Sequence, residues 1–301
     1  MTFWRNLLIK KYYVLHNPLA GNGNKDESYK TLKLFTENEF LEITNFSGYE
    51  KLFESMRPQD VLVICGGDGT LNRFINDVPY LPENDILYYP TGGGNDFWRD
   101  FAGKVTEGEP YKINEYLANL PSVEVNGVKR YFLNNVGYGI DGYCCEVGDK
   151  LKLKNPDKKV NYTGIAIKGL LFNFKTVNAE ITVDGVQYNF DHVWLAPTMN
   201  GKFYGGGMIP TPNQDRLNAN GELFVMVMKG RSKIKTLIIF PKIFKGEHVK
   251  YEKAVKGLTG KDILVKFDKP TALQIYGETV LGVTEYHAVS GKLAEVKREV
   301  A

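Results

Sequence analysis

The fold is decided by residues 61–70, which read Val61-Leu62-Val63-Ile64-Cys65-Gly66-Gly67-Asp68-Gly69-Thr70. The five consecutive apolar residues predict a strand buried on both faces, as in a parallel sheet covered by helices. Three glycines, an aspartate and a threonine follow at once. Beyond this loop, apolar residues at helical spacing (Leu71, Phe74, Ile75 and Val78) predict a helix.

The same pattern recurs on both sides of this segment. A strand over 86–89 ends at Pro90-Thr91-Gly92-Gly93-Gly94-Asn95-Asp96, and a strand over 12–15 ends in a turn-rich loop over 17–23. Between these, we expect a helix over 29–40 and a short strand over 41–44. Strands alternating with helices predict an α/β domain with an open, mostly parallel sheet, whose ligand site lies at the carboxyl ends of the strands.

After about residue 122 the pattern changes to alternating apolar and polar residues with turns. Residues 179–190 alternate in this way around Asp184-Gly185, which is typical of a hairpin. We therefore expect an α/β domain over 1–122 and a mainly antiparallel β-sandwich domain over 123–283. Residues 284–301 could pack back on the first domain. An apolar segment from Tyr162 to Phe174 favours a helix.

Bulk composition narrows the class of protein. The chain has 301 residues, 43% hydrophobic and 24% charged, with a net charge of +3, which argues against disorder and against a nucleic-acid binder. Three cysteines, two of them adjacent, do not form a secreted disulfide framework. No signal-peptide pattern or membrane-spanning window is present. We expect a cytoplasmic protein that contacts membranes only peripherally.

The glycine-rich loop suits phosphate binding. Glycines let backbone N–H groups approach phosphate oxygens closely and tolerate positive φ, and the following helix directs its positive dipole end toward the same place. Gly66, Gly67 and Gly69 supply this freedom, and Thr70 adds a hydroxyl. The loop lacks the lysine and spacing of the Walker A motif and is not G-x-G-x-x-G.

A carboxylate inside a phosphate-binding loop requires a reason. Asp68 would repel phosphate unless Mg²⁺ lies between them, as is common in phosphoryl transfer. The alternative is that Asp68 caps the helix that follows it. The second loop offers Asn95 and a second carboxylate, Asp96, and its Gly92 and Gly93 allow close approach, although a simple tight turn would also explain these glycines.

Two motifs make the pattern specific. Gly-Gly-Asp-Gly-Thr-Leu-Asn at 66–72 and Gly-Asn-Asp-Phe-Trp-Arg at 94–99 resemble the signature loops of bacterial diacylglycerol kinases and related lipid kinases, which share their catalytic domain with sphingosine and ceramide kinases. The resemblance extends to Asn17-Pro18, to residues 200–208 and to residues 273–278, and so spans most of the chain.

This resemblance implies that residues 1–122 are an ATP-binding catalytic domain and residues 123–283 a lipid-substrate domain, and it implies a site and its cofactors. ATP contacts would come from Asn17, from residues 66–71 (Gly66, Gly67, Asp68, Gly69, Thr70 and Leu71), from Thr44, and from Gly92, Gly93 and Asn95 of the second loop. Mg²⁺ would be held by Asp68 and Asp96. The catalytic residues would be Asp68 and Glu278, with Glu278 acting either as the base for the substrate hydroxyl or as part of the metal–water network.

The chain departs from the family pattern at three places. Tyr276 replaces an aspartate two residues before Glu278, and Gly93 replaces a threonine for which Thr91 could substitute. The family's second, structural Mg²⁺ site is built on a Leu-Asp-Asp-Gly turn, but residues 217–221 read Leu-Asn-Ala-Asn-Gly. Because amides bind Mg²⁺ more weakly than carboxylates, we expect this second metal to be absent.

The expected reaction is transfer of the γ-phosphate of ATP to a lipid hydroxyl, most simply that of diacylglycerol, at the inner face of the membrane. The stretch from Lys150 to Phe174 combines lysines with apolar residues and could contact anionic headgroups and line an acceptor slot, or could be an ordinary core helix. Alternatives are a soluble kinase such as an NAD kinase, and a nucleotide or lipid sensor with little turnover. No nucleic-acid partner is expected, and a homodimer is compatible with the sequence.

Overall fold

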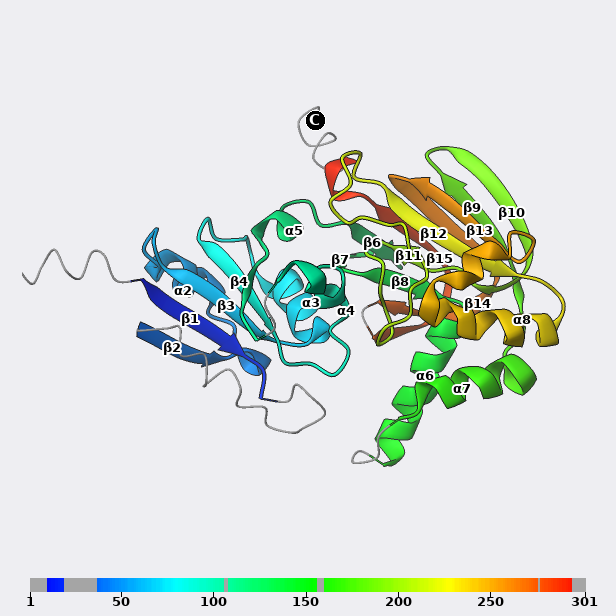
Figure 1. Cartoon of the computed structure of the whole chain (residues 1–301), viewed down its shortest axis with the longest axis horizontal. Helices are drawn as coiled ribbons and strands as arrows, with labels where there is room; N and C mark the ends of the chain where they lie inside the picture. The colour runs from blue at the N-terminus through cyan, green and yellow to red at the C-terminus, as the bar shows by residue number, and fades with distance from the viewer. Residues whose placement is uncertain (1–9, 19–36, 106–107, 156–159, 276, 294–301) are drawn as a thin grey trace, which may run out of the picture. The chain divides into compact units, whose positions relative to one another are not determined.

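The computed structural model describes residues 10–18, 37–105, 108–155, 160–275 and 277–293 (Figure 1). The chain forms two compact units, residues 1–118 and residues 119–301. Each unit has its own sheet.

The first unit is an α/β domain. In chain order, its elements are β1 (Lys11–His16), β2 (Glu37–Glu42), the 3₁₀ turn η2 (Ile43–Asn45), α2 (Tyr49–Ser55), β3 (Val61–Gly66), α3 (Asp68–Asp77), β4 (Asp85–Pro90), α4 (Asp96–Arg99), η3 (Ala102–Lys104), β5 (Tyr111–Lys112) and α5 (Asn114–Ala118). The strand order is β2-β1-β3-β4-β5. The first four strands are parallel and β5 is antiparallel, which confirms the open, mostly parallel sheet.

Hydrophobic burial places β3 at the centre of this sheet. All six of its residues are buried, and β1 and β4 flank it on either side. On α3, the residues that match the helical spacing, Leu71 and Phe74, are fully buried, while the intervening Arg73 is exposed and pairs with Asp77. The apolar stripe of α3 thus faces the protein interior, as the sequence pattern requires.

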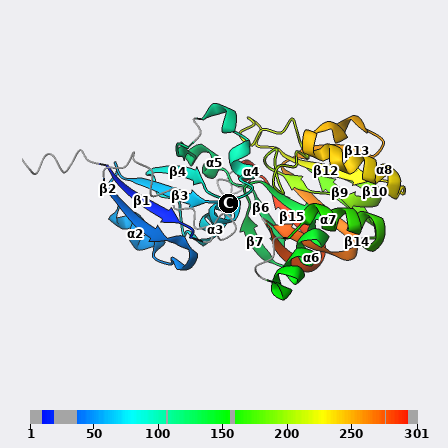
Figure 2. The same ribbon diagram turned by 60° about the horizontal axis from the view of Figure 1, so that its bottom comes forward.

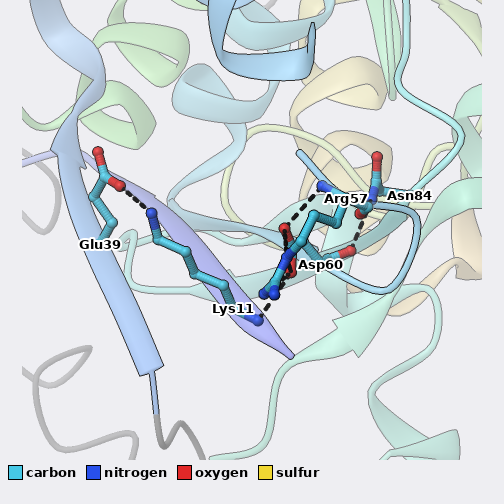
Figure 3. Close-up of polar contacts among 5 residues, drawn as sticks. All are labelled: Lys11, Glu39, Arg57, Asp60 and Asn84. Carbon is cyan, nitrogen blue, oxygen red and sulfur yellow. Dashed lines mark hydrogen bonds and ion pairs between the residues drawn. The ribbon is translucent and has the colours of Figure 1, made fainter. Parts of the chain in front are cut away.

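A buried carboxylate ties together the amino ends of the strands. Asp60, just before β3, accepts hydrogen bonds from the backbone N–H of Lys11 and from the guanidinium and backbone N–H of Arg57 (Figure 3). Asn84 closes the cluster by donating to the backbone carbonyls of Arg57 and Asp60. Burial alone would raise the Asp60 pKa, but these hydrogen bonds lower it. The cluster fixes the edge of the sheet opposite the glycine loops.

One local prediction is wrong. The helix expected over 29–40 overlaps β2, because residues 37–42 pair in parallel register with β1. The strand expected over 41–44 ends at Glu42, and residues 43–45 form a 3₁₀ turn. Pairing with the edge of β1 outweighs the weak local preference of this polar segment. The remainder of the expected helix, 29–36, lies outside the described residues.

The second unit is rich in antiparallel strands. Its elements are β6 (Ser122–Val125), β7 (Val128–Tyr131), β8 (Asn135–Tyr138), α6 (Ile140–Lys154), α7 (Tyr162–Lys168), the π-helical turn η4 (Gly169–Asn173), β9 (Val177–Val183), β10 (Val186–Leu195), β11 (Thr198–Met199), β12 (Leu223–Lys229), α8 (Lys233–Ile239), η5 (Phe240–Lys245), η6 (Glu247–Lys250), β13 (Val255–Gly260), β14 (Asp262–Ile275) and β15 (Glu278–Val289). Residues 284–289 pair within this unit, with β14 and β6.

The long strand β14 organises this sheet. Its first half pairs with β9 and its second half with β8, so that the path β8-β11-β12-β10-β9 closes on β14. The enclosed interior is packed with the inward-facing side chains of these strands, including Phe267, which stacks on Tyr138. The hairpin predicted at Asp184-Gly185 joins β9 to β10, and both turn residues have positive φ, as a type I′ turn requires.

Helices cover one side of this second sheet. In Figures 1 and 2, α6 and α7 are green and α8 is yellow, and α7 with its continuation η4 leads toward α8. They bury a second apolar cluster with the outer faces of β10 and β12, which includes Leu170, Phe174, Ile239 and Met226. The helix predicted from Tyr162 to Phe174 is confirmed up to Asn173.

Candidate active site

The two glycine loops meet at the carboxyl edge of the parallel sheet. The backbone N–H of Thr91, at the start of the second loop, donates to the carbonyl of Gly66 at 3.0 Å, and the Tyr88 hydroxyl donates to the same carbonyl at 3.0 Å. The adjacency follows from parallel pairing, because β3 and β4 end side by side with Gly66 opposite Pro90. The location predicted for the loops from the sequence is thus correct.

Asp68 joins the two loops. Its Oδ2 accepts the backbone N–H of Asp96 and its Oδ1 accepts that of Phe97, each at 2.8 Å. These are the first amides of α4, so Asp68 satisfies donors of a helix that begins 28 residues later in the chain. The helix that Asp68 begins, α3, has Gly67 as its N-cap. The capping alternative was therefore partly right, because Asp68 satisfies amides at the start of a helix, and the helix whose amides it accepts here is α4.

The glycines allow the two loops to touch each other, and they also leave space for a ligand. A Cβ on Gly92 would overlap the Cα of Gly67 and lie 2.8 Å from Asn95 Oδ1, so these two backbones can touch only because neither residue has a side chain. None of Gly66, Gly67 and Gly69 has positive φ, so the first loop does not use that freedom. Gly69 is different, because a Cβ there would meet nothing within 4 Å. The open space beside Gly69 is where a ligand could approach the loop.

Polar side chains from other strand ends extend the site. Asn17 follows β1, and its Nδ2 donates to Thr70 Oγ1 at 2.8 Å, so the hydroxyl hydrogen of Thr70 can still be donated. Thr44 follows β2 at the same edge, with its hydroxyl donating to Glu42. Asn95 makes two bonds to the backbone of Gly92, which folds the second loop on itself. Asn95 therefore shapes this loop internally.

Asp96 was expected to share a metal with Asp68. Asp96 is buried, with its Oδ1 3.8 Å from Arg99 Nε. Both carboxylates lie close enough to the buried Tyr88 that their charges, after burial itself, raise its pKa. The described residues contain no cluster of three or more His, Cys, Asp or Glu that could hold a metal. Two carboxylates nevertheless suit Mg²⁺ when nucleotide phosphates and water supply most of its ligands.

Glu278 belongs to the second unit. It begins β15 directly after Gly277, a positive-φ residue, and its side chain is 69% exposed. Its Oε2 accepts from the Arg130 guanidinium at 2.7 Å. An exposed carboxylate at a strand end is accessible to a substrate hydroxyl. Tyr276, the departure from the family pattern, lies outside the described residues.

A polar cluster in the second unit was not predicted from the sequence. Asp141, on the first turn of α6, has a buried Oδ2 that lies against Gly137 and makes no hydrogen bond. Burial raises the pKa of this carboxyl to about 7, although hydrogen bonds from Gln274 and Tyr204 oppose the shift. An ionisable residue two positions after Gly139, which itself follows the buried strand β8, was the signal in the sequence that could have revealed it.

The turn that carries the family's structural Mg²⁺ is held differently in this chain. Asn218 bonds to the backbone of Asp215 and Glu222, and Lys292 Nζ donates to the carbonyls of Ala219 at 2.8 Å and Asn218 at 3.4 Å. An ammonium group thus contacts the carbonyl oxygens of this turn. The donor set of the turn therefore does not fit a Mg²⁺ site, because a cation of the chain already lies against it.

Comparisons with known proteins agree with this arrangement. Residues 11–124 match the diacylglycerol kinase catalytic domain, and residues 134–292 match the YegS C-terminal NAD kinase beta sandwich-like domain. The chain belongs to the bacterial diacylglycerol kinase and lipid kinase family. Membership confirms the resemblance seen in the two loops and makes the protein a member of a family of phosphotransferases.

Individual relatives of this lipid kinase family member cover most of its length. YtlR of Bacillus subtilis (strain 168), provisionally named a lipid kinase, is 24% identical over 307 residues, which cover 93% of this chain and 96% of that protein. A diacylglycerol kinase of Mycobacterium tuberculosis (strain H37Rv) is 26% identical over 265 residues, 81% of each chain. The crystal structure of a diacylglycerol kinase from Bacillus anthracis has the same fold, with a TM-score of 0.60, 19% identity and coverage of 94% and 95%.

The helices differ from membrane spans in length and polarity. None of the helices in the described ranges is long and apolar enough to cross a bilayer.

Proposed function

We propose that the protein is an ATP- and Mg²⁺-dependent lipid kinase that transfers the γ-phosphate to the hydroxyl of a diacylglycerol-like lipid. The observation that carries the proposal is the Asp68 carboxylate, which holds the second loop against the Gly-Gly-Asp-Gly-Thr loop while the space beside Gly69 stays open. This gives a preorganised loop pair at the edge where α/β sheets bind ligands. The names of the relatives support the lipid acceptor.

In this proposal the nucleotide phosphates lie over residues 66–71, with Thr70 donating a hydroxyl and Asn17 orienting it. Asp68 Oδ1 and Oδ2 each accept a backbone N–H, and a carboxylate oxygen has more than one acceptor site. Asp68 and Asp96 together would hold Mg²⁺, which supplies neutralisation of phosphate charge. Gly92 and Gly93 keep the second loop free of side chains near the ligand.

Glu278 acts in this proposal as the general base. Its carboxylate accepts the proton of the lipid hydroxyl as that oxygen bonds to the γ-phosphorus, and the bond to the β,γ-bridging oxygen breaks to release ADP. Arg130 binds only Oε2, which leaves Oε1 available for the proton. The protein would act at the inner face of the membrane without spanning it.

The first test is transfer from labelled ATP to a panel of acceptors: diacylglycerol, ceramide, sphingosine and NAD. We expect a labelled lipid, with diacylglycerol preferred. Phosphorylation of NAD without any lipid would replace the proposal with a soluble NAD kinase. ATP binding without transfer to any acceptor would favour the sensor alternative.

A second test asks whether Glu278 acts as the general base or contributes only a negative charge. Glu278→Gln should lower lipid phosphorylation by about 10²- to 10⁴-fold, because general base catalysis contributes on that scale, while ATP affinity is retained. The matched control is Glu285→Gln, which removes another exposed carboxylate of β15, 3.8 Å from Lys266. Equal activity of the two variants would remove Glu278 from the mechanism.

A further inference from the structure

The outer surface of α7, η4, α8 and η5 exposes large apolar side chains. Phe172 and Ile234 are each 72% exposed and Ile238 is 58% exposed, values far above those of residues that serve the core. Ile167 and Phe244 add 43% and 41%. We call these five residues, together with the exposed lysines Lys168, Lys175, Lys235 and Lys245 of the same region, the docking face. Leaving this much apolar side chain in water is unfavourable, so the face marks an interaction surface.

The docking face is one surface formed by segments far apart in the sequence. η4 and α8 are in contact, and Lys233 Nζ from α8 donates to the carbonyl of Leu171 in η4 at 2.8 Å. Their inner residues, Leu170 and Ile239, lie in the same buried cluster, which fixes the two elements together. Figures 1 and 2 both show η4 adjoining α8. Ile234 and Ile238 are four residues apart and so share one side of α8.

The charge of these segments has a single sign. Residues 160–178 and 229–246 contain eight lysines or arginines and no aspartate or glutamate. Of these, Lys168, Lys175, Arg231, Lys233, Lys235 and Lys245 are exposed. A partner that fits must therefore carry negative charge at its surface and accept apolar side chains just beneath that surface.

A membrane meets both conditions at once. A second copy of this chain would bring cations against cations, because a two-fold interface uses the same patch on both partners. Single-stranded nucleic acid is bound through stacking on aromatic rings, whereas three of the five apolar residues of the face are isoleucines. A bilayer with anionic lipids attracts lysines at its headgroups and accepts aliphatic side chains at the acyl boundary.

We infer that the docking face binds the surface of an anionic lipid bilayer, with Phe172, Ile234 and Ile238 inserted and the lysines at headgroup level. Its biological role rests on the proposed function, since a lipid kinase must reach an acceptor that stays in the membrane. The binding itself involves no chemistry and is measured separately. Within the stretch 150–174, whose sequence suggested membrane contact, α7 and η4 contribute to this surface, and α8 and η5 supply the rest.

The test is co-sedimentation of the full chain with vesicles of phosphatidylcholine alone or mixed with phosphatidylglycerol. We expect strong, salt-sensitive binding only to the mixed vesicles. Ile234→Ser with Ile238→Ser should weaken it at least about tenfold, since both side chains leave the acyl boundary. Lys175→Gln with Lys235→Gln should weaken it about fivefold per lysine.

Matched controls change the same chemistry elsewhere. Val128→Ser with Val186→Ser removes two apolar side chains that are 54% and 55% exposed on β7 and β10, and should leave binding unchanged. Lys129→Gln with Lys104→Gln removes two exposed lysines outside the docking face and should also leave it unchanged. Circular dichroism and the unfolding midpoint show whether each variant is folded.

Four results with vesicles or in solution would overturn the inference. These are equal binding to both vesicle types, no vesicle binding, equal loss in the controls, or a wild-type dimer that Ile234→Ser with Ile238→Ser converts to a monomer. Lysine-dependent binding of an oligonucleotide in place of vesicles would have the same effect. Phosphorylation of a water-soluble short-chain diacylglycerol separates the two proposals. If that activity is present without vesicle binding, only the docking inference fails; vesicle binding without any lipid phosphorylation defeats only the proposed function.

Discussion

Asp68→Asn should destabilise the first unit as well as impair catalysis. The wild-type carboxylate accepts two backbone N–H groups at 2.8 Å, those of Asp96 and Phe97. Hydrogen bonds to charged groups contribute about 1.5–3 kcal/mol each. An asparagine keeps one acceptor and turns its NH₂ group toward the other N–H, so one bond is lost and one buried donor is left unmatched. We expect a loss of about 2–4 kcal/mol in the free energy of unfolding.

Two measurements check this value. Urea unfolding gives the free energy, and hydrogen exchange gives the protection of the α4 amides, which should fall first at Asp96 and Phe97. The matched control is Asp77→Asn on the same helix, which removes an exposed ion pair with Arg73 and should cost less than about 1 kcal/mol. An Asp68→Asn protein that unfolds like the wild type, with unchanged exchange but no kinase activity, would refute the bridging role and leave only a ligand role.

Close contacts elsewhere in the chain give three more expected outcomes. Gly92→Ala should separate the glycine loops, because the new methyl overlaps Gly67, and should raise the Kd for ATP; a crystal structure with unmoved loops would contradict this. Lys292→Met removes the ammonium from the turn carbonyls and should lower stability by about 1–3 kcal/mol, with added Mg²⁺ unable to restore it in thermal unfolding. The pKa of Asp141 is about 7 in the folded protein against 3.8 in the unfolded chain, so the folded state keeps this proton to higher pH. The free energy of unfolding therefore falls as pH rises from about 4 to 7. In Asp141→Asn the part of this loss that lies between pH 5 and pH 8, about 3 kcal/mol, should disappear from urea unfolding; parallel pH profiles would be the contrary result.

The strand, loop and helix pattern around Asp68 predicted the parallel sheet and the edge at which the loops meet. Burial of a continuous apolar run needs helices on both faces, and parallel strands place their carboxyl ends together, so local sequence was sufficient. Strand pairing was not predictable where the local signal was weak. The polar segment 37–42 became a strand because β1 offered an unpaired edge, which no local pattern records.

The sequence by itself determined the family, the two kinds of sheet and the identity of the loop residues, because these depend on short motifs and on periodicity. Only the tertiary structure decided what Asp68 binds, since its partners are amides 28 and 29 residues away. The same holds for Lys292 against the 217–221 turn and for the docking face, which joins η4 to α8. Each of these contacts joins segments that are distant in sequence. Their arrangement is set by the packing energy of the whole unit, which cannot be read from any one segment.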